Sequence, residues 1–548
     1  MKRSLLTKLL LGAASAIVLF IAYWFVLPPL NLRSPDFWSF LIFAVILVTV
    51  LFAGNAIFKS LKELPHEKGH FAFMKIKGAA GLGIKIVLGS IAAVVAVNLV
   101  AAIIGMPIFN AKGYYNLISV SDGNFAEDIA EIDMSAIPVV DRDTASRLGR
   151  RKLGEMKDLV SQFEITPDFT QINYNNSPYR VTTLTYGDVF KWLNNQSEGI
   201  PAYITVDMVT QEASLVRLEE GIKYSEGEYF YRNIHRYLRF NYPTKIFDEL
   251  CFEIDDKGTP YWIAPCITYR IGIWSGKDIE GAVLVNAVTG EHEYLPLDKI
   301  PSWVDQVFIS DLVVEQLNYY GLYVNGFWNS IFGQQDVLQT TQGYNYLAID
   351  DDVWLYTGMT SVASDESNVG FVLVNLRTKE ARFYTVPGAE EYSAMDSAKG
   401  QVQHLNYSST FPILLNIADR PTYFVSLKDD AGLVKLYAFV DVERYQIVGT
   451  GATVAEAKAD YAAKLKSEDI EVPGNLTADI TVSDVRFLVT GGESNAYIYD
   501  SEGNIWIIPV SLDSRLAFIE NGSTVSVEYS EANGVKAVTK VTSVTLNG

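Results

Sequence analysis

A short segment that recurs along the chain constrains its fold more than any other feature of the sequence. Its clearest form lies at 281–291 and reads GAVLVNAVTGE. Similar segments lie at 201–212, at 370–380 and, in a looser form, at 435–445. In each, a run of β-branched, aliphatic or aromatic residues favours a strand, and an Asp or Asn that can bond the backbone opens a turn. We therefore predict four β-hairpins.

The hairpins lie far enough apart to belong to separate units. With Ile204, Leu284, Leu373 and Phe439 taken as equivalent, the intervals are 80, 89 and 66 residues. These exceed the roughly 20–50 residues of a solenoid repeat. Apolar residues at three-to-four spacing precede the hairpins and predict helices. We expect each unit to pack a helix against a small antiparallel sheet, which is an α+β fold.

Two further details of these units can be predicted. The strands are apolar almost throughout, as in the run AVLV at 282–285, so both faces of a sheet should be covered. Thr453 followed three residues later by Glu456 is typical of a capping box and predicts that a last helix begins there. The helices are expected within 141–163, 224–247, 304–332, 393–402 and 453–465.

Three long apolar runs dominate the first 109 residues. They cover residues 9–26, 37–58 and 86–106, and each is close to the ~20 residues that a helix needs to cross the hydrocarbon core. Basic residues precede the first run and fill the segment between the second and third, which places both segments in the cytoplasm by the positive-inside rule. Three spans then put residues 110–548 on the extracytoplasmic side of the cell membrane.

A cleaved signal peptide is the alternative for residues 1–30, because a basic start before an apolar run is also its signature. No small-x-small cleavage site follows the run, which favours a retained anchor. In the third run, Gly89 with Ala93 and Ala92 with Ala96 have the small-xxx-small spacing that lets helices pack closely. Lipid is one expected partner, and a second copy of the chain in a homo-oligomer is another.

The net charge of −20, from 44 basic and 64 acidic residues, argues against nucleic acid or an anionic lipid surface as a partner. One segment, 229–242, is locally basic, with Arg232, Arg236 and Arg239 at helical spacing among aromatic residues. Such a helix can bind a polyanionic cell-wall polymer or the acidic face of a neighbouring unit. Packing inside the protein is the alternative interpretation.

From residue 473 onward the sequence changes to short strands separated by turns rich in Gly, Asn and Asp. Regular short strands with such turns are typical of a small β-barrel of the OB or SH3 type. The strands are expected at 477–486, 496–499, 504–509, 523–529 and 535–544.

The two cysteines, Cys251 and Cys266, flank a hairpin that turns near residue 257. An oxidising compartment would allow a disulfide between them. The turn places Cys251 opposite residue 263 or 264, so that Cys266 is slightly out of line for a bond. The sequence leaves the bonded and the free state open.

His66, Glu67 and His70 form the pattern HEKGH, a literal H-E-x-x-H. It is similar to the motif of intramembrane site-2 metalloproteases, which implies two zinc ligands and a glutamate that activates water. Here Pro65 precedes the motif, Gly69 weakens a helix, and the first and third apolar runs contain no acidic residue as a third ligand. A coincidental loop sequence is the alternative.

Asp350, Asp351 and Asp352, with Asp365 and Glu366 nearby, could supply oxygen ligands to Ca²⁺. A solvated turn before a strand is the other interpretation of these aspartates. The sequence contains neither a G-x-S-x-G nucleophile elbow nor a Walker-type phosphate loop. We predict no cofactor.

The segment YWIAP at 261–265, followed by GAVLVNAVTGE at 281–291, resembles the PepSY domain, in which a helix precedes strands with a V-(D/N)-x-x-T-G-E turn. The resemblance extends to degenerate copies within residues 141–465, of which only the second carries the Thr-Gly-Glu turn. It implies non-catalytic extracytoplasmic modules, often linked to peptidase inhibition or to regulation of the cell envelope.

These observations predict how the chain is divided and what it does. The expected parts are a three-helix transmembrane anchor (1–109), a connector (110–140), α+β units (141–223, 224–303, 304–388 and 389–472) and a small β-barrel (473–548). We expect a non-catalytic binding or scaffold protein that binds or regulates an envelope partner. The alternatives are a membrane metallopeptidase that uses His66, Glu67 and His70, and a subunit of an oligomeric membrane assembly.

Overall fold

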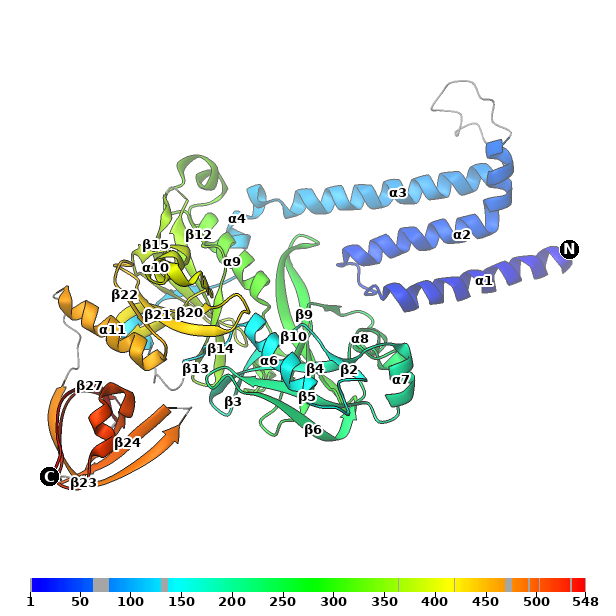
Figure 1. The fold of residues 1–548 in the computed structure, drawn as a ribbon. Coiled ribbons are helices and arrows are strands. Elements are labelled where there is room, and N and C mark those ends of the chain that lie inside the picture. The colour runs from blue at the N-terminus through cyan, green and yellow to red at the C-terminus, as the bar shows by residue number, and fades with distance from the viewer. Residues whose placement is uncertain are drawn as a thin grey trace.

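The structure is a computed structural model of the 548-residue chain. It describes residues 2–62, 78–129, 137–362, 364–417, 419–468, 476–490, 493–501, 503–532 and 535–547. Figure 1 shows three long helices that extend from one side of a globular part, and a small C-terminal body on the other side.

The three apolar runs form long helices that lie side by side in Figure 1. They are α1 (Lys2–Val26), α2 (Pro35–Lys62) and α3 (Gly78–Gly105). Among the described residues, only the Lys85–Gly105 part of α3 is long and apolar enough to cross a membrane. The apolar parts of the other two helices, Leu11–Val26 and Pro35–Leu51, are shorter. Membrane attachment is therefore supported by one helix, and the three-span anchor stays a prediction.

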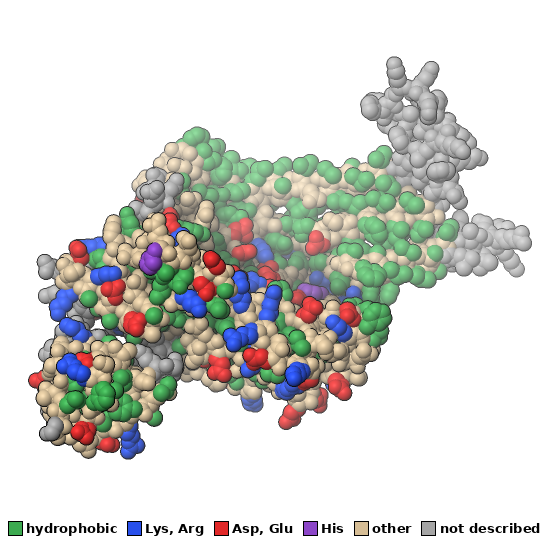
Figure 2. Space-filling view, viewed as in Figure 1, with side chains coloured by type: hydrophobic (Ala, Val, Ile, Leu, Met, Phe, Trp, Pro, Cys, Tyr) green, Lys and Arg blue, Asp and Glu red, His purple; other side chains and the backbone are tan. Residues whose placement is uncertain are grey.

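The surface of these helices is apolar. Large hydrophobic side chains such as those of Phe20, Leu99 and Ile103 are 56%, 59% and 52% exposed. Figure 2 shows charged side chains spread over the globular part and almost none along the long helices. An apolar surface of this extent indicates that something covers it.

Each of the four predicted hairpins is present, and each lies in its own mainly antiparallel sheet. The paired strands are β5 (Ile200–Asp207) with β6 (Ala213–Ile222), β10 (Ser275–Asn286) with β11 (His292–Pro296), β15 (Ser364–Asn375) with β16 (Ala381–Tyr384), and β21 (Val434–Asp441) with β22 (Val448–Gly451). The prediction of recurring hairpins, and of an α+β fold built from them, is confirmed.

A helix precedes the strands of every unit. These helices are α6 (Arg142–Gly154), α8 (Ile234–Asn241), α9 (Ser310–Leu322) and α10 (Glu391–Gln401). The helices α8 and α9 are much shorter than their predicted segments. The helix α8 ends just before Pro243, since a proline disfavours helical backbone at the residue before it.

Two short strands follow each helix, and both pair along the same long strand, so that one edge of every sheet is interrupted. They are β2 (Phe163–Ile165) and β3 (Thr170–Tyr174) on β4 (Ser177–Tyr186), β7 (Ile246–Phe247) and β8 (Cys251–Ile254) on β9 (Pro260–Ile271), β12 (Leu338–Thr340) and β13 (Asn345–Ile349) on β14 (Asp352–Ser361), and β18 (Ser408–Ser409) and β19 (Ile413–Ile417) on β20 (Arg420–Lys428). The long strand then pairs with the first strand of the hairpin.

The second and third sheets are covered on both faces, as predicted. In β10, Val283 and Val285 belong to one hydrophobic core, whereas Ala282 and Leu284 belong to another. The alternate residues of β15 are divided in the same way. The second core also contains apolar residues of α9, so this helix packs between sheets and not on an outer face.

The predicted connector, 110–140, is partly built into the third unit. It contains the end of α4 (Pro107–Tyr115), β1 (Val120–Asp122) and α5 (Phe125–Asp128). The strand β1 pairs in parallel with β16. This pairing has no local signal in the sequence, because the two strands are far apart along the chain.

The five C-terminal strands lie where the sequence predicted them. They are β23 (Leu476–Thr490), β24 (Glu493–Asp500), β25 (Ile505–Pro509), β26 (Thr524–Ala532) and β27 (Val535–Thr545). They pair in the order β23-β24-β25-β27-β26, and β26 pairs back with β23, which closes a barrel. The helix α11 (Val454–Ser467) precedes the barrel and begins at the predicted capping box of Thr453 and Glu456.

Candidate functional site

The turn of each recurring hairpin is shaped by the Asp or Asn that opens it. Asn286 Oδ1 accepts hydrogen bonds from the backbone N–H groups of Val288 and Thr289, at 3.0 and 2.9 Å. Asp207 and Asn375 accept equivalent bonds in the first and third hairpins. The recurring motif therefore serves to form turns.

The copies of the motif differ at the residue after the threonine. Where this residue is not glycine, its side chain bonds a neighbouring unit. Gln211, Gly290 and Lys379 occupy this position, and all are left-handed, with φ of 62°, 77° and 66°. Gln211 Nε2 donates to the hydroxyl of Tyr437 in the fourth unit at 2.9 Å. Lys379 Nζ lies 2.6 Å from a carboxylate oxygen of Asp278 in the second unit. The copies that depart from glycine thus gain bonds between units.

Two of the predicted arginines hold the second unit against the end of α1. Arg239 Nε donates to the carbonyl oxygen of Leu27 at 2.9 Å, and Arg236 Nε donates to that of Trp24 at 3.3 Å. The Arg236 guanidinium also lies 4.6 Å from the centre of the Trp24 ring. The carbonyl oxygen of Trp24 has no hydrogen-bond partner within the helix, because Pro28, four residues later, has no N–H. Cations here also oppose the negative end of the helix dipole.

Arg232 has a different role, since its guanidinium donates to the carbonyl oxygen of Gln196 in the first unit. All three guanidinium groups are thus bonded to backbone carbonyls of the chain itself. This arrangement favours the packing interpretation of the basic segment over a site for a polyanionic polymer.

The turn between β9 and β10 extends this contact to the other long helices. Trp274 Nε1 donates to the carbonyl oxygen of Leu32, between α1 and α2, at 3.4 Å. Gly105, which ends α3, lies so close to Ser275 that a Cβ atom on the glycine would collide with the serine hydroxyl. We call this surface of the second unit the helix seat; it comprises Arg236, Arg239, Trp274 and Ser275.

Two buried carboxyl groups that sequence reasoning missed, Glu253 and Asp305, lie where the first three units meet. Their exposed fractions are 0% and 1%. Glu253 accepts hydrogen bonds from the N–H groups of Asp305 and Gln306, both at 2.9 Å. Asp305 Oδ2 accepts one from the N–H of Asn173 at 2.7 Å. A signal was present, because Glu253 interrupts the apolar strand CFEI at 251–254.

Burial sets the protonation of this pair. It raises the pKa of Glu253 to about 8, against the two backbone N–H bonds that lower it. It raises the pKa of Asp305 well above the usual value, and the neighbouring Glu253 carboxylate adds to the increase. The pair therefore retains at least one proton near neutral pH.

The three aspartates predicted as Ca²⁺ ligands lie near this pair and take separate roles. Asp352 pairs with Arg377 at 2.6 Å, and the backbone carbonyl of Asp350 accepts a bond from Asn173. Burial raises the pKa of Asp351. Among the described residues, no group of three His, Cys, Asp or Glu side chains is placed to hold a metal ion. These contacts favour a turn over a Ca²⁺ site; the side chains of Asp365 and Glu366 lie outside the described part.

Cys251 and Cys266 are free and buried. Cys251 lies opposite Ile263, as the turn predicted, whereas Cys266 lies opposite Phe247 on one side and Gly281 on the other. The register thus resolves the two open states in favour of free thiols. Burial raises the pKa of both, that of Cys266 to about 12, so neither is a ready nucleophile.

The motif residues His66, Glu67 and His70 lie outside the described residues.

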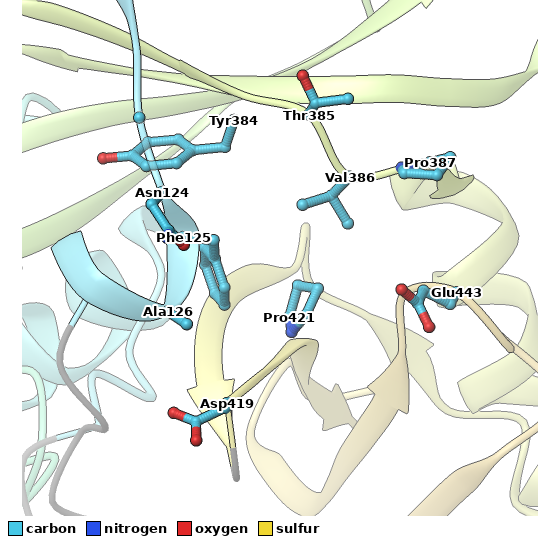
Figure 3. Close-up of a pocket in the computed structure, with 11 residues that line it drawn as sticks. Asn124, Phe125, Ala126, Tyr384, Thr385, Val386, Pro387, Asp419, Pro421 and Glu443 are labelled. Atoms are coloured by element: carbon cyan, nitrogen blue, oxygen red, sulfur yellow. The ribbon is translucent and has the colours of Figure 1, made fainter.

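A cavity of about 490 Å³ lies at the turn of the fourth hairpin (Figure 3). Phe125 lines one side of it, and Val386 and Pro421 line the other. The carboxylates of Asp419 and Glu443 also line it, the latter paired with an arginine. The sequence did not reveal this cavity, because α5, the end of β16 and the fourth unit form its walls together. Its lining combines apolar side chains with polar groups and carboxylates, and such a lining suits a ligand that carries a cationic group.

No protein-family model matches the chain, and no curated protein has a significantly similar sequence.

Proposed function

We propose that the chain is a membrane-anchored extracytoplasmic binding or scaffold protein of the cell envelope. In this proposal α1, α2 and α3 cross the membrane, with the N-terminus in the cytoplasm. Four units similar to PepSY domains and a C-terminal barrel of the OB or SH3 type lie outside. The chain binds an envelope protein or a wall polymer without transforming it.

The helix seat is the observation that carries this proposal. Arg236 and Arg239 bond carbonyl oxygens at the end of α1, which joins the apolar helices firmly to the second unit. A long apolar helix with an exposed surface is stable where lipid replaces water. The charged surface of the remaining chain suits an aqueous compartment, and this proposal therefore puts the seat at the boundary between lipid and water.

The contacts between units support a scaffold. The hairpin turns bond the first unit to the fourth through Gln211 and the third to the second through Lys379. Such bonds fix the units relative to one another, so that a surface shared by several units keeps its shape. The cavity lined by Phe125, Asp419 and Glu443 is one place where an envelope partner with a basic side chain would bind.

Cysteine labelling in intact cells tests the location. Phe518 in the barrel is 72% exposed, so Phe518→Cys should react with a membrane-impermeant maleimide in intact cells. Lys68→Cys, in the segment predicted to be cytoplasmic, should react only after the cells are made permeable. The native cysteines are buried and provide a low background. The opposite labelling pattern, or release of the chain from membranes by alkaline carbonate, would contradict the proposal.

A further inference from the structure

Two short helices of the globular part expose large apolar side chains next to α1. They are α7 (Val189–Asn195) and the 3₁₀ helix η3 (Phe230–Arg232). The exposed side chains are Val189 (40%), Phe190 (73%), Leu193 (51%), Tyr229 (41%), Phe230 (65%) and Tyr231 (47%). We call these six residues the aromatic edge. Single exposed apolar residues are ordinary, but a group of large ones marks a surface that meets a partner.

A buried tryptophan joins the two segments of the aromatic edge. The centre of the Trp192 ring lies 4.9 Å from that of Tyr229 and 5.8 Å from that of Phe230. Trp192 Nε1 donates to Glu228 at 2.8 Å, and the Tyr186 hydroxyl donates to the other oxygen of this buried carboxylate at 2.7 Å. The aromatic edge is therefore a fixed surface and not a loose loop.

Phe230 exposes its ring at a cost to its backbone. Its φ is 50°, in the left-handed region, which is unfavourable for a residue other than glycine. The Phe230 carbonyl oxygen accepts a hydrogen bond from Arg236, the side chain that also bonds Trp24 in α1. One arginine thus links the aromatic edge directly to the apolar helix.

The second unit runs alongside the outer end of α1 and does not only touch its tip. On α8, the Phe240 ring lies 5.5 Å from that of Trp24 and 6.5 Å from that of Phe20. Because a helix rises about 1.5 Å per residue, Phe20 lies roughly 9 Å before Val26. Figure 1 shows α8 beside the end of α1 with α7 next to α8, and Figure 2 shows hydrophobic side chains on this side of the globular part. Phe240 thus lies beside the apolar part of α1, and Arg236 ties the Phe230 end of the aromatic edge to the same stretch of the helix.

We propose that the aromatic edge inserts into the outer leaflet of the bilayer. This inference rests on the proposed function, since it requires α1 to be in the membrane. Interfacial segments sink about 5–10 Å into the headgroup region, which matches the stretch of α1 that α8 follows. Tyrosine favours this depth, because its ring is apolar and its hydroxyl is polar. Apolar contact drives the insertion, since a net charge of −20 disfavours attraction to an anionic surface.

The geometry has a mechanical consequence. The helix seat already holds the second unit against the end of α1, and a second contact with the bilayer beside the helices further fixes the angle of the globular part to the membrane plane. The partner of the aromatic edge is thus phospholipid acyl chains, and zwitterionic lipid should be sufficient.

Fluorescence quenching by lipid tests this insertion. The full chain carrying Phe190→Cys is labelled with an environment-sensitive fluorophore and placed in phosphatidylcholine nanodiscs that contain spin-labelled lipid. We expect quenching several-fold stronger than for the matched control Phe518→Cys, which lies in the barrel and is 72% exposed. Equal, weak quenching at the two positions would overturn the inference.

Two further readouts separate this inference from the proposed function. A chain that enters nanodiscs without quenching at residue 190 overturns the insertion and leaves the membrane anchor intact. A chain that does not enter nanodiscs overturns both. A doubled native mass together with an unquenched label would assign the aromatic edge to a second copy of the chain, which also contradicts lipid insertion. Identical melting of labelled and unlabelled chains shows that the label does not disturb the fold.

Discussion

At the residue scale, a comparison of two hairpin turns distinguishes the contribution of backbone strain to stability from the contribution of bonds between units. Lys379 and Gln211 occupy equivalent left-handed positions, with φ of 66° and 62°, so glycine would relieve similar strain at both. Their partners differ. Lys379 forms an ion pair with Asp278, in which the side chains are 14% and 11% exposed, whereas Gln211 forms a neutral hydrogen bond with Tyr437.

We expect Lys379→Gly to lower the free energy of unfolding by about 1–3 kcal/mol. Removal of one partner of a buried ion pair costs about 3–5 kcal/mol, and two effects offset part of this cost. Glycine relieves about 1 kcal/mol of strain, and Asp278 keeps its contact with Arg270. The matched control Gln211→Gly should change the free energy of unfolding by less than about 1 kcal/mol. The hydrogen bond that it loses contributes about as much as the backbone strain that glycine relieves. Urea unfolding in detergent measures both; equal stabilities would contradict the role of Lys379.

The pair of Glu253 and Asp305 predicts a pH dependence of stability. The ordinary pKa of Glu253 is 4.5 and burial raises it to about 8, so the folded chain binds more protons than the unfolded chain between these values. The free energy of unfolding should therefore fall as pH rises through this interval. Since one pKa unit corresponds to about 1.4 kcal/mol, the decrease should amount to a few kcal/mol.

The variant Asp305→Asn tests whether the buried pair causes this pH dependence of stability. An asparagine oxygen can still accept the bond from the N–H of Asn173, but only one buried carboxyl group remains, so the decrease from about pH 5 to about pH 8 should be smaller. Asp396→Asn is the control, because that carboxylate is 74% exposed, and it should keep the wild-type slope. Urea midpoints at the two pH values provide the measurement. A wild-type midpoint that rises with pH would reject the account.

At the element scale, the helix seat depends on charged bonds to the end of α1. Arg239 is 8% exposed and donates to the carbonyls of Leu27 and Lys245. We expect Arg239→Met to destabilise the chain by about 2–4 kcal/mol, since a hydrogen bond from a charged group contributes about 1.5–3 kcal/mol and methionine retains part of the packing. Arg217→Met is the control, because the pair of Arg217 with Asp158 is 52% and 59% exposed, and it should cost less than about 1 kcal/mol. Similar losses in both variants would remove the special role of the seat.

The elements show which parts of the fold were predictable. The hairpins and the strands of the barrel were, because alternating turn residues and β-formers are local signals. The interrupted edge strands were not, since pieces as short as β7 and β18 carry too little pattern. For the candidate site, the sequence singled out the arginines of α8 but not their partners. Arg236 and Trp24 are separated by 212 residues, and only the folded chain brings them together.

At the scale of the whole molecule, the hydrophobic cores separate the four units from the C-terminal barrel. One core contains Ile204, Val283, Leu373 and Phe439, and so draws on all four units. The units therefore stabilise one another, and their division by sequence does not correspond to independent stability. The barrel has a core of its own, around Trp506.

This division predicts the behaviour of three shortened chains. A chain that ends at residue 468 should keep the unfolding midpoint of the full chain, because the described residues of the barrel and of the units belong to separate cores. Residues 470–548 alone should fold, since domains above about 55 residues commonly do so. Removal of residues 391–468 should instead abolish cooperative unfolding, because the fully buried Phe424, Phe439 and Tyr461 belong to the common core. Urea unfolding and circular dichroism of the three chains test this. If loss of the barrel shifted the midpoint as much as loss of the fourth unit, the barrel would be part of the same cooperative body.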